Sequence, residues 1–225
     1  MTEISAQFLL QKEDFILDVN FKIPAPQITI IYGQSGSGKT TLLRCIAGLE
    51  QAEKAELTVN GEVWQDSAKN IFLPTHLRKI GYVSQKNSLF PHLSVEENLF
   101  FGFKRIAKNQ QKIDPKKIIA ALKIENLLSR KTDKLSGGET QKIAIARSLL
   151  TSPEILLMDE PVSALDDNNK KEILDCIKNL HQQLALPILY VSHSKEETKY
   201  LAEGFAGKFI FLENGRITDF NSNRI

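Results

Sequence analysis

The stretch Gly33-Gln34-Ser35-Gly36-Ser37-Gly38-Lys39-Thr40 fits the pattern G-x-x-x-x-G-K-[ST] of a phosphate-binding loop. An apolar, β-rich run at residues 28–32 precedes it, and a helical pattern at residues 41–47 follows it. Strand, loop and helix in this order are the context that the motif requires, so an ordinary Gly/Ser-rich turn is the weaker interpretation. The sequence therefore predicts a nucleoside triphosphate site in an α/β fold.

Each residue type in this loop has a chemical task. Glycines let backbone N–H groups curl around phosphates, and the helix N-terminus adds a positive dipole. Lys39 reaches the terminal phosphates, and Thr40 offers its hydroxyl to Mg²⁺. The predicted nucleotide contacts are Gly33, Gln34, Ser35, Gly36, Ser37, Gly38, Lys39, Thr40 and Thr41.

Length and charge narrow the classes of protein. The chain has 225 residues, enough to bury a core as one domain, and its formal net charge of +2 gives no strong attraction to nucleic acid or anionic lipid. The basic segment at residues 104–117 is interpreted as a solvated helical face. No window approaches the roughly 18 apolar residues of a membrane span, and residues 1–10 lack a signal-peptide pattern, so we expect a soluble, intracellular chain. Cys45 and Cys176 are predicted to be buried thiols.

Short strands alternate with helices along the chain, with one interruption. Apolar β-rich runs at residues 28–32, 80–83, 155–158 and 188–192 predict central parallel strands. An antiparallel flank is predicted by the strand-like pattern at Leu9, residues 15–21 and residues 57–64, together with the turn signal Asn60-Gly61. Residues 209–217, with Asn214-Gly215, predict a last hairpin at the sheet edge. Between residues 87 and 134 the pattern becomes helical and rich in Lys, Gln and Asn, which predicts an inserted helical subdomain.

Two carboxylates, Asp159 and Glu160, end the apolar run at residues 155–158. Asp159 is expected to hold Mg²⁺ directly or through water, and Glu160 to orient and deprotonate the attacking water. A pair of solvent-facing acids at a strand end is the common alternative. The phosphate-binding loop in the same chain favours the catalytic interpretation.

A second loop of small residues, Leu135-Ser136-Gly137-Gly138-Glu139-Thr140-Gln141, leads into a helical pattern at residues 142–150. A helix N-terminus attracts anions, and Ser136 adds a hydroxyl donor. The segment resembles the signature motif of ABC-type ATPases, whereas a flexible linker would not be followed at once by a helix. The resemblance implies a head-to-tail dimer in which Ser136, Gly137 and Gly138 contact the nucleotide of the opposite copy.

Further positions match the ABC pattern in order. The resemblance implies that Gln85 approaches Mg²⁺, that Asp166 of Ser163-Ala164-Leu165-Asp166 crosses the dimer interface, and that His193 contacts the γ-phosphate. His76, His92 and His181 are interpreted as structural. The implied catalytic residues are Glu160, His193, Gln85 and Lys39; the implied Mg²⁺ site is Thr40, Gln85 and Asp159; and the implied cofactors are ATP and Mg²⁺.

The resemblance covers about residues 15–217 and implies the P-loop NTPase fold of ABC ATPases. That fold has a RecA-like parallel core, an antiparallel β flank and an inserted helical subdomain. On this basis residues 1–225 form a single ABC ATPase domain, in which residues 87–150 are the approximate helical subdomain that carries the signature motif.

Within the family, the chain looks most like the ATP-binding subunits of molybdate importers. These often carry an additional C-terminal β-domain that binds oxyanion, and we expect no such domain here. Ser84 occupies a position that is commonly aromatic. Leu10 stands where many ABC ATPases stack an aromatic ring on adenine, with Phe8 and Phe15 as alternatives. The likeness is carried by Ile23-Pro24-Ala25, Leu73-Pro74-Thr75-His76-Leu77-Arg78-Lys79-Ile80-Gly81-Tyr82-Val83, Leu89-Phe90-Pro91-His92-Leu93-Ser94-Val95 and Leu189-Tyr190-Val191-Ser192-His193-Ser194.

The resemblance implies an ATP-hydrolysing motor of an importer for molybdate or a related oxyanion. The implied partners are a second copy of the chain, transmembrane permease subunits and, indirectly, a substrate-binding protein, at the cytoplasmic face of the membrane and without nucleic acid. The alternatives are an importer of another substrate such as sulfate, or a soluble ABC ATPase acting on DNA or the ribosome. About 100 residues separate the phosphate-binding loop from the signature, which leaves no room for the long coiled coil of chromosome-structuring relatives.

The segment Leu89-Phe90-Pro91-His92-Leu93 is too apolar for an idle surface loop. We expect residues 87–97, just after Gln85, to form part of a groove that receives a short helix of the membrane subunit. The alternative is that Phe90 turns inward and belongs to the core of the helical subdomain.

Overall fold

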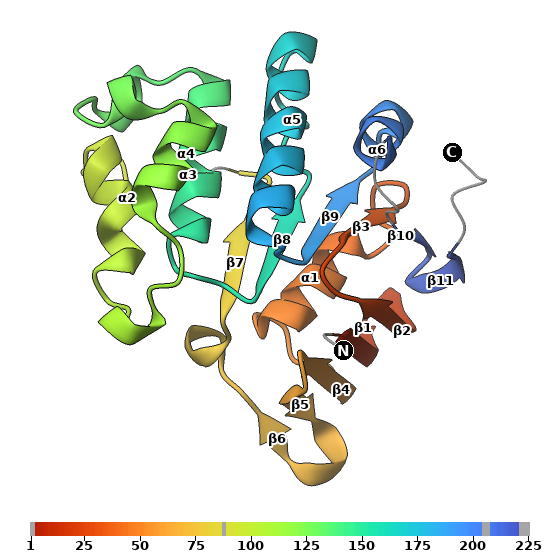
Figure 1. The fold of residues 1–225 in the computed structure, drawn as a ribbon. Helices are drawn as coiled ribbons and strands as arrows, with labels where there is room; N and C mark the ends of the chain where they lie inside the picture. The colour runs from red at the N-terminus through yellow and green to blue at the C-terminus, as the bar shows by residue number, and fades with distance from the viewer. Residues whose placement is uncertain (1–2, 87–88, 204–207, 221–225) are drawn as a thin grey trace. The chain divides into compact units, whose positions relative to one another are not determined.

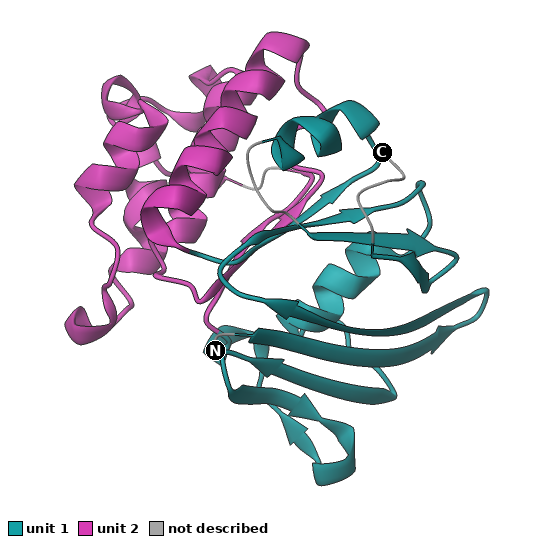
Figure 2. Ribbon diagram, turned by 45° about the vertical axis from the view of Figure 1, so that its right-hand side comes forward, with its two compact units in different colours: residues 1–78, 186–225 teal, residues 79–185 magenta. Residues whose placement is uncertain are grey.

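The computed structural model describes residues 3–86, 89–203 and 208–220. Figure 1 shows the secondary structure along the chain. The chain divides into two compact units, residues 1–78 with 186–225 and residues 79–185, which Figure 2 colours separately.

The first unit is built on a sheet with two short helices. Its strands are β1 (Glu3–Lys12), β2 (Phe15–Pro24), β3 (Ile28–Tyr32), β4 (Lys54–Val59), β5 (Glu62–Asp66), β6 (Ile71–Phe72), β9 (Ile188–Ser192), β10 (Lys208–Glu213) and β11 (Arg216–Asp219). Its α-helices are α1 (Lys39–Ala47) and α6 (Lys195–Ala202). The strand order is β6-β5-β4-β1-β2-β11-β10-β3-β9.

The predicted antiparallel flank is confirmed by the pairing of β4 and β2 with β1 and of β4 with β5. Buried and more exposed residues alternate along β1 and β2, which is the pattern of a sheet with one face on a core. Asn60 and Gly61 both have positive φ in the turn between β4 and β5, as a two-residue hairpin requires.

The parallel strands of this unit are also confirmed. β3 pairs with β9 and with β10 in parallel register. Residues 28–31 and all of β9 are buried, because parallel strands are normally covered on both faces. The continuous apolar runs at residues 28–32 and 188–192 therefore correspond to strands buried on both faces.

The prediction that residues 209–217 form a hairpin at the sheet edge is wrong in its placement. β10 and β11 do form an antiparallel hairpin, but β10 also pairs with β3 and β11 also pairs with β2. The hairpin therefore joins the parallel strands to the antiparallel flank inside the sheet. Pairing with strands about 180 to 200 residues earlier leaves no local signal, so the turn Asn214-Gly215 predicts the hairpin but not its neighbours.

A buried arginine fixes the C-terminal end of α1. Arg78 is 4% exposed and donates hydrogen bonds to the carbonyl oxygens of Cys45, Ile46 and Leu73. Burial lowers the pKa of Arg78 to about 10, and a cation at a helix C-terminus is favoured by the helix dipole. Since α1 begins at Lys39, this clamp holds the far end of the helix that carries the phosphate-binding loop.

Both cysteines are buried thiols, as predicted. Desolvation by burial raises the pKa of Cys45 to about 12, and it also raises the pKa of Cys176. A thiol with a raised pKa holds little thiolate at neutral pH and is a poor nucleophile. Neither cysteine therefore has the features of a reactive site.

The second unit is mainly helical. It contains the parallel strands β7 (Ile80–Val83) and β8 (Ile155–Asp159) and the helices α2 (Val95–Phe103), α3 (Pro115–Leu122), α4 (Gly137–Leu149) and α5 (Asp167–Leu184). α4 lies at its centre, in contact with α2, α3, α5 and β7. α2, α3 and α4 fall within the expected helical subdomain, residues 87–150, of which residues 87 and 88 lie outside the described part of the chain.

Helix boundaries in this unit follow local capping rules. Ser94 and Glu97 form a capping box at the start of α2, and Pro115 occupies the first turn of α3. Within the described ranges of the chain, no helix combines the length and apolar character needed to cross a membrane.

Candidate functional site

The phosphate-binding loop connects β3 to α1 in the first unit and is held by the side chain of Lys39. Lys39 Nζ donates to the carbonyl oxygens of Gly33 and Gln34, at 2.8 Å each. Gly38, the N-cap of α1, has φ of 101°, a conformation that L side chains rarely adopt. A Cβ at Gly33 would lie 2.2 Å from the carbonyl oxygen of Leu212. Only glycine fits at these two positions.

The N-terminus of α1 differs from that of every other α-helix in the described residues. It has no side-chain cap and no acidic residue in its first turn, which suits the positive end of the helix dipole to an anion. The other five α-helices have a side-chain cap at their N-cap residue, namely Ser94, Asp114, Ser136, Asp166 and Ser194.

A second feature of the loop also fits a phosphate group. The hydroxyl of Ser37 is buried and has no hydrogen-bond partner. A buried polar atom normally has a partner, so this hydroxyl is suited to a ligand that brings acceptor oxygens. A hollow of about 370 Å³ borders the loop, lined by residues 32–37 and 211–214.

His193 lies near the start of this loop because of the strand register. Tyr32 pairs with Ser192 across the parallel strands β3 and β9. Gly33 and His193 therefore leave the sheet side by side, at the carboxyl ends of the strands where α/β folds bind ligands. His193 is exposed. The first unit thus brings together the loop and the predicted phosphate-contacting histidine.

In the second unit, β7 and β8 bring Gln85 and Glu160 together. Val83 pairs with Met158, and just beyond this pair Gln85 Nε2 donates to Glu160 Oε2 at 3.3 Å. Glu160 has φ of 47°, a left-handed conformation that costs an L-residue about 1–2 kcal/mol. Such an outlier points to a functional constraint at this carboxylate.

Asp159 has a neighbour that the sequence did not single out. The hydroxyl of Tyr82 donates to Asp159 Oδ2 at 3.3 Å, and Asp159 is 4% exposed. Tyr82 lies on β7, opposite Leu157 in the parallel register. No local sequence signal predicts this contact, because it joins residues 77 positions apart.

The signature loop forms the N-terminus of α4. Ser136 and Glu139 make a capping box, in which Ser136 Oγ accepts from Glu139 N and Glu139 Oε2 accepts from Ser136 N at 2.8 Å. The hydrogen bond from the Ser136 backbone lowers the pKa of Glu139. The box supplies the loop with its own carboxylate. Ser136 keeps its O–H as a donor, and the N–H groups of Gly137 and Gly138 belong to the first turn.

Asp166 caps α5 by accepting a hydrogen bond from Asn169 N at 3.0 Å. The backbone hydrogen bond from Asn169 lowers the pKa of Asp166, so the cap is a carboxylate at neutral pH. A Cβ at Gly138 would lie 2.6 Å from Asn169 Oδ1, so α5 also explains one glycine of the signature.

The predicted site residues are thus divided between the units. The first unit contains the phosphate-binding loop with Lys39 and Thr40, the adjoining Thr41, and His193. The second unit contains Gln85, Asp159, Glu160, the signature loop and Asp166. In the described part of the chain, no group of three or more His, Cys, Asp or Glu side chains is arranged to hold a metal ion.

The position of Phe15 bears on the base of a nucleotide. Phe8 is fully buried and Leu10 is 5% exposed, so neither side chain is available to a ligand. Phe15 is half-buried, and a Cβ at Gly38 would lie 2.5 Å from its Cζ. The ring therefore lies on the phosphate-binding loop. It also lines a second hollow of about 690 Å³ between residues 11–16 and residues 213–218.

Comparison with known proteins places this geometry in a class. The family model described as ABC transporter matches residues 16–163. A solved structure of the ATP-binding cassette MJ0796, described as a dimeric post-hydrolysis state bound to ADP and Pi, has a TM-score of 0.76 with 25% sequence identity and covers 97% of each chain. The chain belongs to the ABC transporter family, and its fold is that of the P-loop ABC ATPases.

Individual relatives are more similar in sequence. The molybdenum import ATP-binding protein ModC 1 of Azotobacter vinelandii is 49% identical over 96% of this chain, and ModC of Pseudomonas fluorescens is 50% identical over 95%. ModC of Pseudomonas aeruginosa is 50% identical over 90%. The matched part spans 58%, 58% and 55% of the length of these relatives.

Proposed function

We propose that the chain binds ATP with Mg²⁺ and hydrolyses it as the motor subunit of an importer for molybdate or a related oxyanion. The observation that carries the ATP part is the uncapped N-terminus of α1, with the unpartnered hydroxyl of Ser37 beside it. The transport part is supported by the 49–50% identity to relatives named as molybdenum import ATP-binding proteins.

The chemistry assigned to each side chain follows from its type and place. Lys39 and the first N–H groups of α1 bind the phosphates, and His193 donates a hydrogen bond to the terminal phosphate. Thr40, Gln85 and Asp159 would hold Mg²⁺, which neutralises charge on the phosphates when bound. Glu160 accepts the proton of the attacking water, with Gln85 Nε2 orienting the carboxylate at 3.3 Å.

The assignment of Glu160 is tested by Glu160→Gln. Loss of the base should lower kcat for ATP hydrolysis by about 10²- to 10⁴-fold, while the affinity for ATP stays unchanged because phosphate binding uses other groups. Steady-state hydrolysis and calorimetric binding of ATP measure the two quantities. Glu125→Gln, an exposed carboxylate of the same unit, serves as the matched control and should behave as wild type. Hydrolysis near the wild-type rate in Glu160→Gln excludes this carboxylate as the base.

We further propose that Phe15 stacks on the adenine ring. Its support is the location of the ring on Gly38, its partial exposure, and the adjoining hollow of about 690 Å³. Aromatic rings bind bases through their faces. Leu10 does not contact the base in this proposal, because its side chain is buried in the core face of β1.

Phe15→Ala should weaken ATP binding by about tenfold or more, since stacking on a base contributes about 1–3 kcal/mol. Phe15→Trp should retain the affinity. Inorganic tripolyphosphate, which has no base, should bind wild type and both variants equally in the same calorimetric titration. If Phe15→Ala binds ATP as wild type does, or loses tripolyphosphate to the same degree, the ring does not stack on the base.

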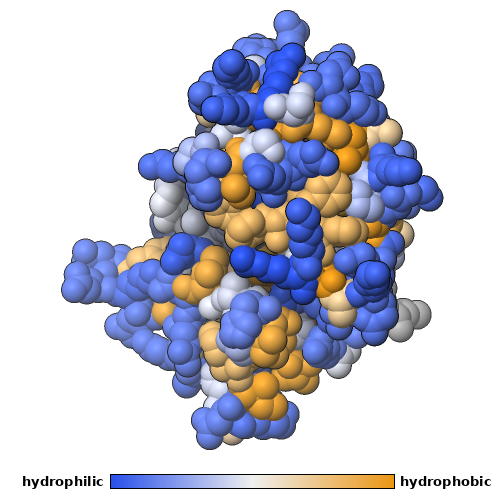
Figure 3. All heavy atoms as spheres, turned by 90° about the vertical axis from the view of Figure 1, so that its left-hand side faces the viewer, coloured by the Kyte–Doolittle hydropathy of each residue, from blue (hydrophilic) through white to orange (hydrophobic). Residues whose placement is uncertain are grey.

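Contact with permease subunits is proposed for the apolar face beside α2. Leu89, Phe90 and Leu93 are only partly buried, and so are Phe100, Phe101 and Phe103. Figure 3 looks at the side of the molecule that carries α2 and shows apolar side chains gathered on it. A patch of this kind is typical of a protein interface.

Phe90 packs against side chains of its own unit and is also part of the apolar face beside α2. Its ring centroid lies 4.5 Å from that of Phe101 and the guanidinium of Arg147 lies 5.0 Å from it, so part of the ring packs inward. Its backbone is tied to Asn98, which accepts from Phe90 N at 2.8 Å. Leu93 has no ring to pack in this way and is partly buried, so it is the position chosen to disturb a docked helix.

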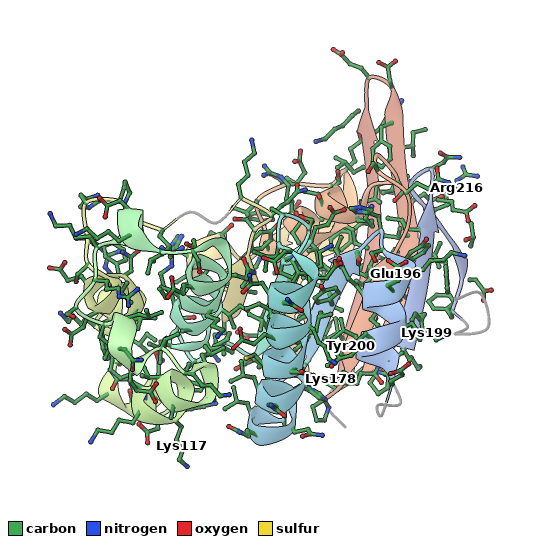
Figure 4. The ribbon with its side chains drawn as sticks, turned by 90° about the horizontal axis from the view of Figure 1, so that it is seen from above. Lys117, Lys178, Glu196, Lys199, Tyr200 and Arg216 are labelled. Atoms are coloured by element: carbon green, nitrogen blue, oxygen red, sulfur yellow. The ribbon has the colours of Figure 1, made fainter. Side chains whose placement is uncertain are left out.

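Leu93→Asp should abolish molybdate-stimulated ATPase activity in proteoliposomes that contain the permease, because the carboxylate would have to be buried against the docked helix. The basal ATPase of the isolated chain should stay at the wild-type level. Lys117→Asp, on α3 of the same unit, is the control and should remain stimulated; Figure 4 labels this residue. Wild-type stimulation of Leu93→Asp contradicts the docking surface.

Stimulation by sulfate but not by molybdate or tungstate would contradict the proposed substrate instead.

A further inference from the structure

A buried carboxylate, Glu197, lies in the first turn of α6 and is 8% exposed. Its Oε2 accepts a hydrogen bond from Ser192 Oγ at 2.7 Å and another from the hydroxyl of Tyr190 at 3.4 Å. Ser192 and Tyr190 are alternate residues of β9, so both hydroxyls come from the same face of the strand. Glu197 thus joins the first turn of α6 to the end of β9.

The same hydrogen-bond network holds the turn on both sides of His193. Ser192 Oγ, besides donating to Glu197, accepts from Ser194 N at 3.0 Å. Ser194 Oγ accepts from Glu197 N at 3.3 Å, and Ser194 O accepts from Thr198 Oγ1 at 2.6 Å. The residues immediately before and after His193 are therefore both connected to Glu197 or its helix.

Packing alone does not account for a carboxylate at this place. Burying a charged group is costly unless donors compensate it, and the two donors found here are neutral hydroxyls. Among the described residues Glu197 forms no ion pair. A leucine would fill the space without this cost, so the oxygen acceptor of Glu197 is the feature that needs an explanation.

We propose that Glu197 is a positioning residue for His193. It acts through Ser192 and Ser194 and sets the orientation of the His193 imidazole. The backbone of His193 leaves β9 next to Gly33 at the end of β3. This inference rests on the proposed function, in which His193 contacts the terminal phosphate of ATP. Glu197 itself touches no nucleotide in this account.

The first test compares two substitutions at Glu197 in the full chain. Glu197→Gln keeps an oxygen acceptor for Ser192 and should retain most of kcat for ATP hydrolysis. Glu197→Ala removes the acceptor and should lower kcat by about 10- to 100-fold, the loss expected from a small misplacement of a catalytic group. The affinity for ATP should change by less than about twofold. Lys199→Ala, on the exposed side of α6, is the control and should match wild type (Figure 4).

A double variant separates positioning from a general structural role. If Glu197 acts only through His193, then His193→Ala with Glu197→Ala should hydrolyse ATP no more slowly than His193→Ala alone. A structural role would instead multiply the two losses. Multiplied losses, equal loss in Glu197→Gln and Glu197→Ala, or a wild-type rate in Glu197→Ala would each overturn the proposal.

A measurement without catalysis keeps the inference independent of the proposed function. The chain has 4 histidines, whose imidazole signals can be resolved by NMR. Glu197→Ala should shift or broaden the His193 signal and leave those of His76, His92 and His181 in place, whereas Glu197→Gln should leave all of them in place. An unmoved His193 signal contradicts the positioning role even if the chain hydrolyses ATP. A moved signal in a chain without ATPase activity would refute the proposed function alone.

Discussion

The hydrogen bonds from Lys39 to the carbonyl oxygens of Gly33 and Gln34 are the contacts on which the rest of the site depends. They hold the loop in a shape that leaves the first N–H groups of α1 without a side-chain cap. Arg78 fixes the opposite end of the same helix through buried carbonyl oxygens. A helix secured at both ends is suited to anion binding, because its N-terminus carries the positive end of the helix dipole.

Much of the fold could be predicted from sequence because its signals are local. The run Ile28–Tyr32 and the turn Asn60-Gly61 each specify their structure within a few residues, and both are confirmed. The placement of β10 and β11 inside the sheet could not be predicted in this way, because their neighbours β3 and β2 lie near the other end of the chain. Strand order is a property of tertiary packing that turn chemistry does not record.

The candidate site shows the same division. The phosphate-binding motif predicts Lys39, the two acids at the strand end predict Glu160, and the resemblance to ABC ATPases implies His193. The sequence does not predict the contact of Tyr82 with Asp159 or the location of Phe15 on Gly38, because these depend on side-chain positions between strands and loops. The left-handed backbone of Glu160 has no sequence signal either, since glutamate seldom adopts it.

From the resemblance to ABC ATPases we propose that the phosphate-binding loop is half of a composite site, which a second copy completes with Ser136 and the two glycines after it. The most direct measurement is the ATPase rate per chain as a function of protein concentration in the isolated protein. For a composite site, this rate should rise in proportion to concentration when the chain is dilute and reach a plateau once dimers predominate. A rate per chain that is independent of concentration from the dilute limit upward, with gel filtration showing monomers, would contradict it.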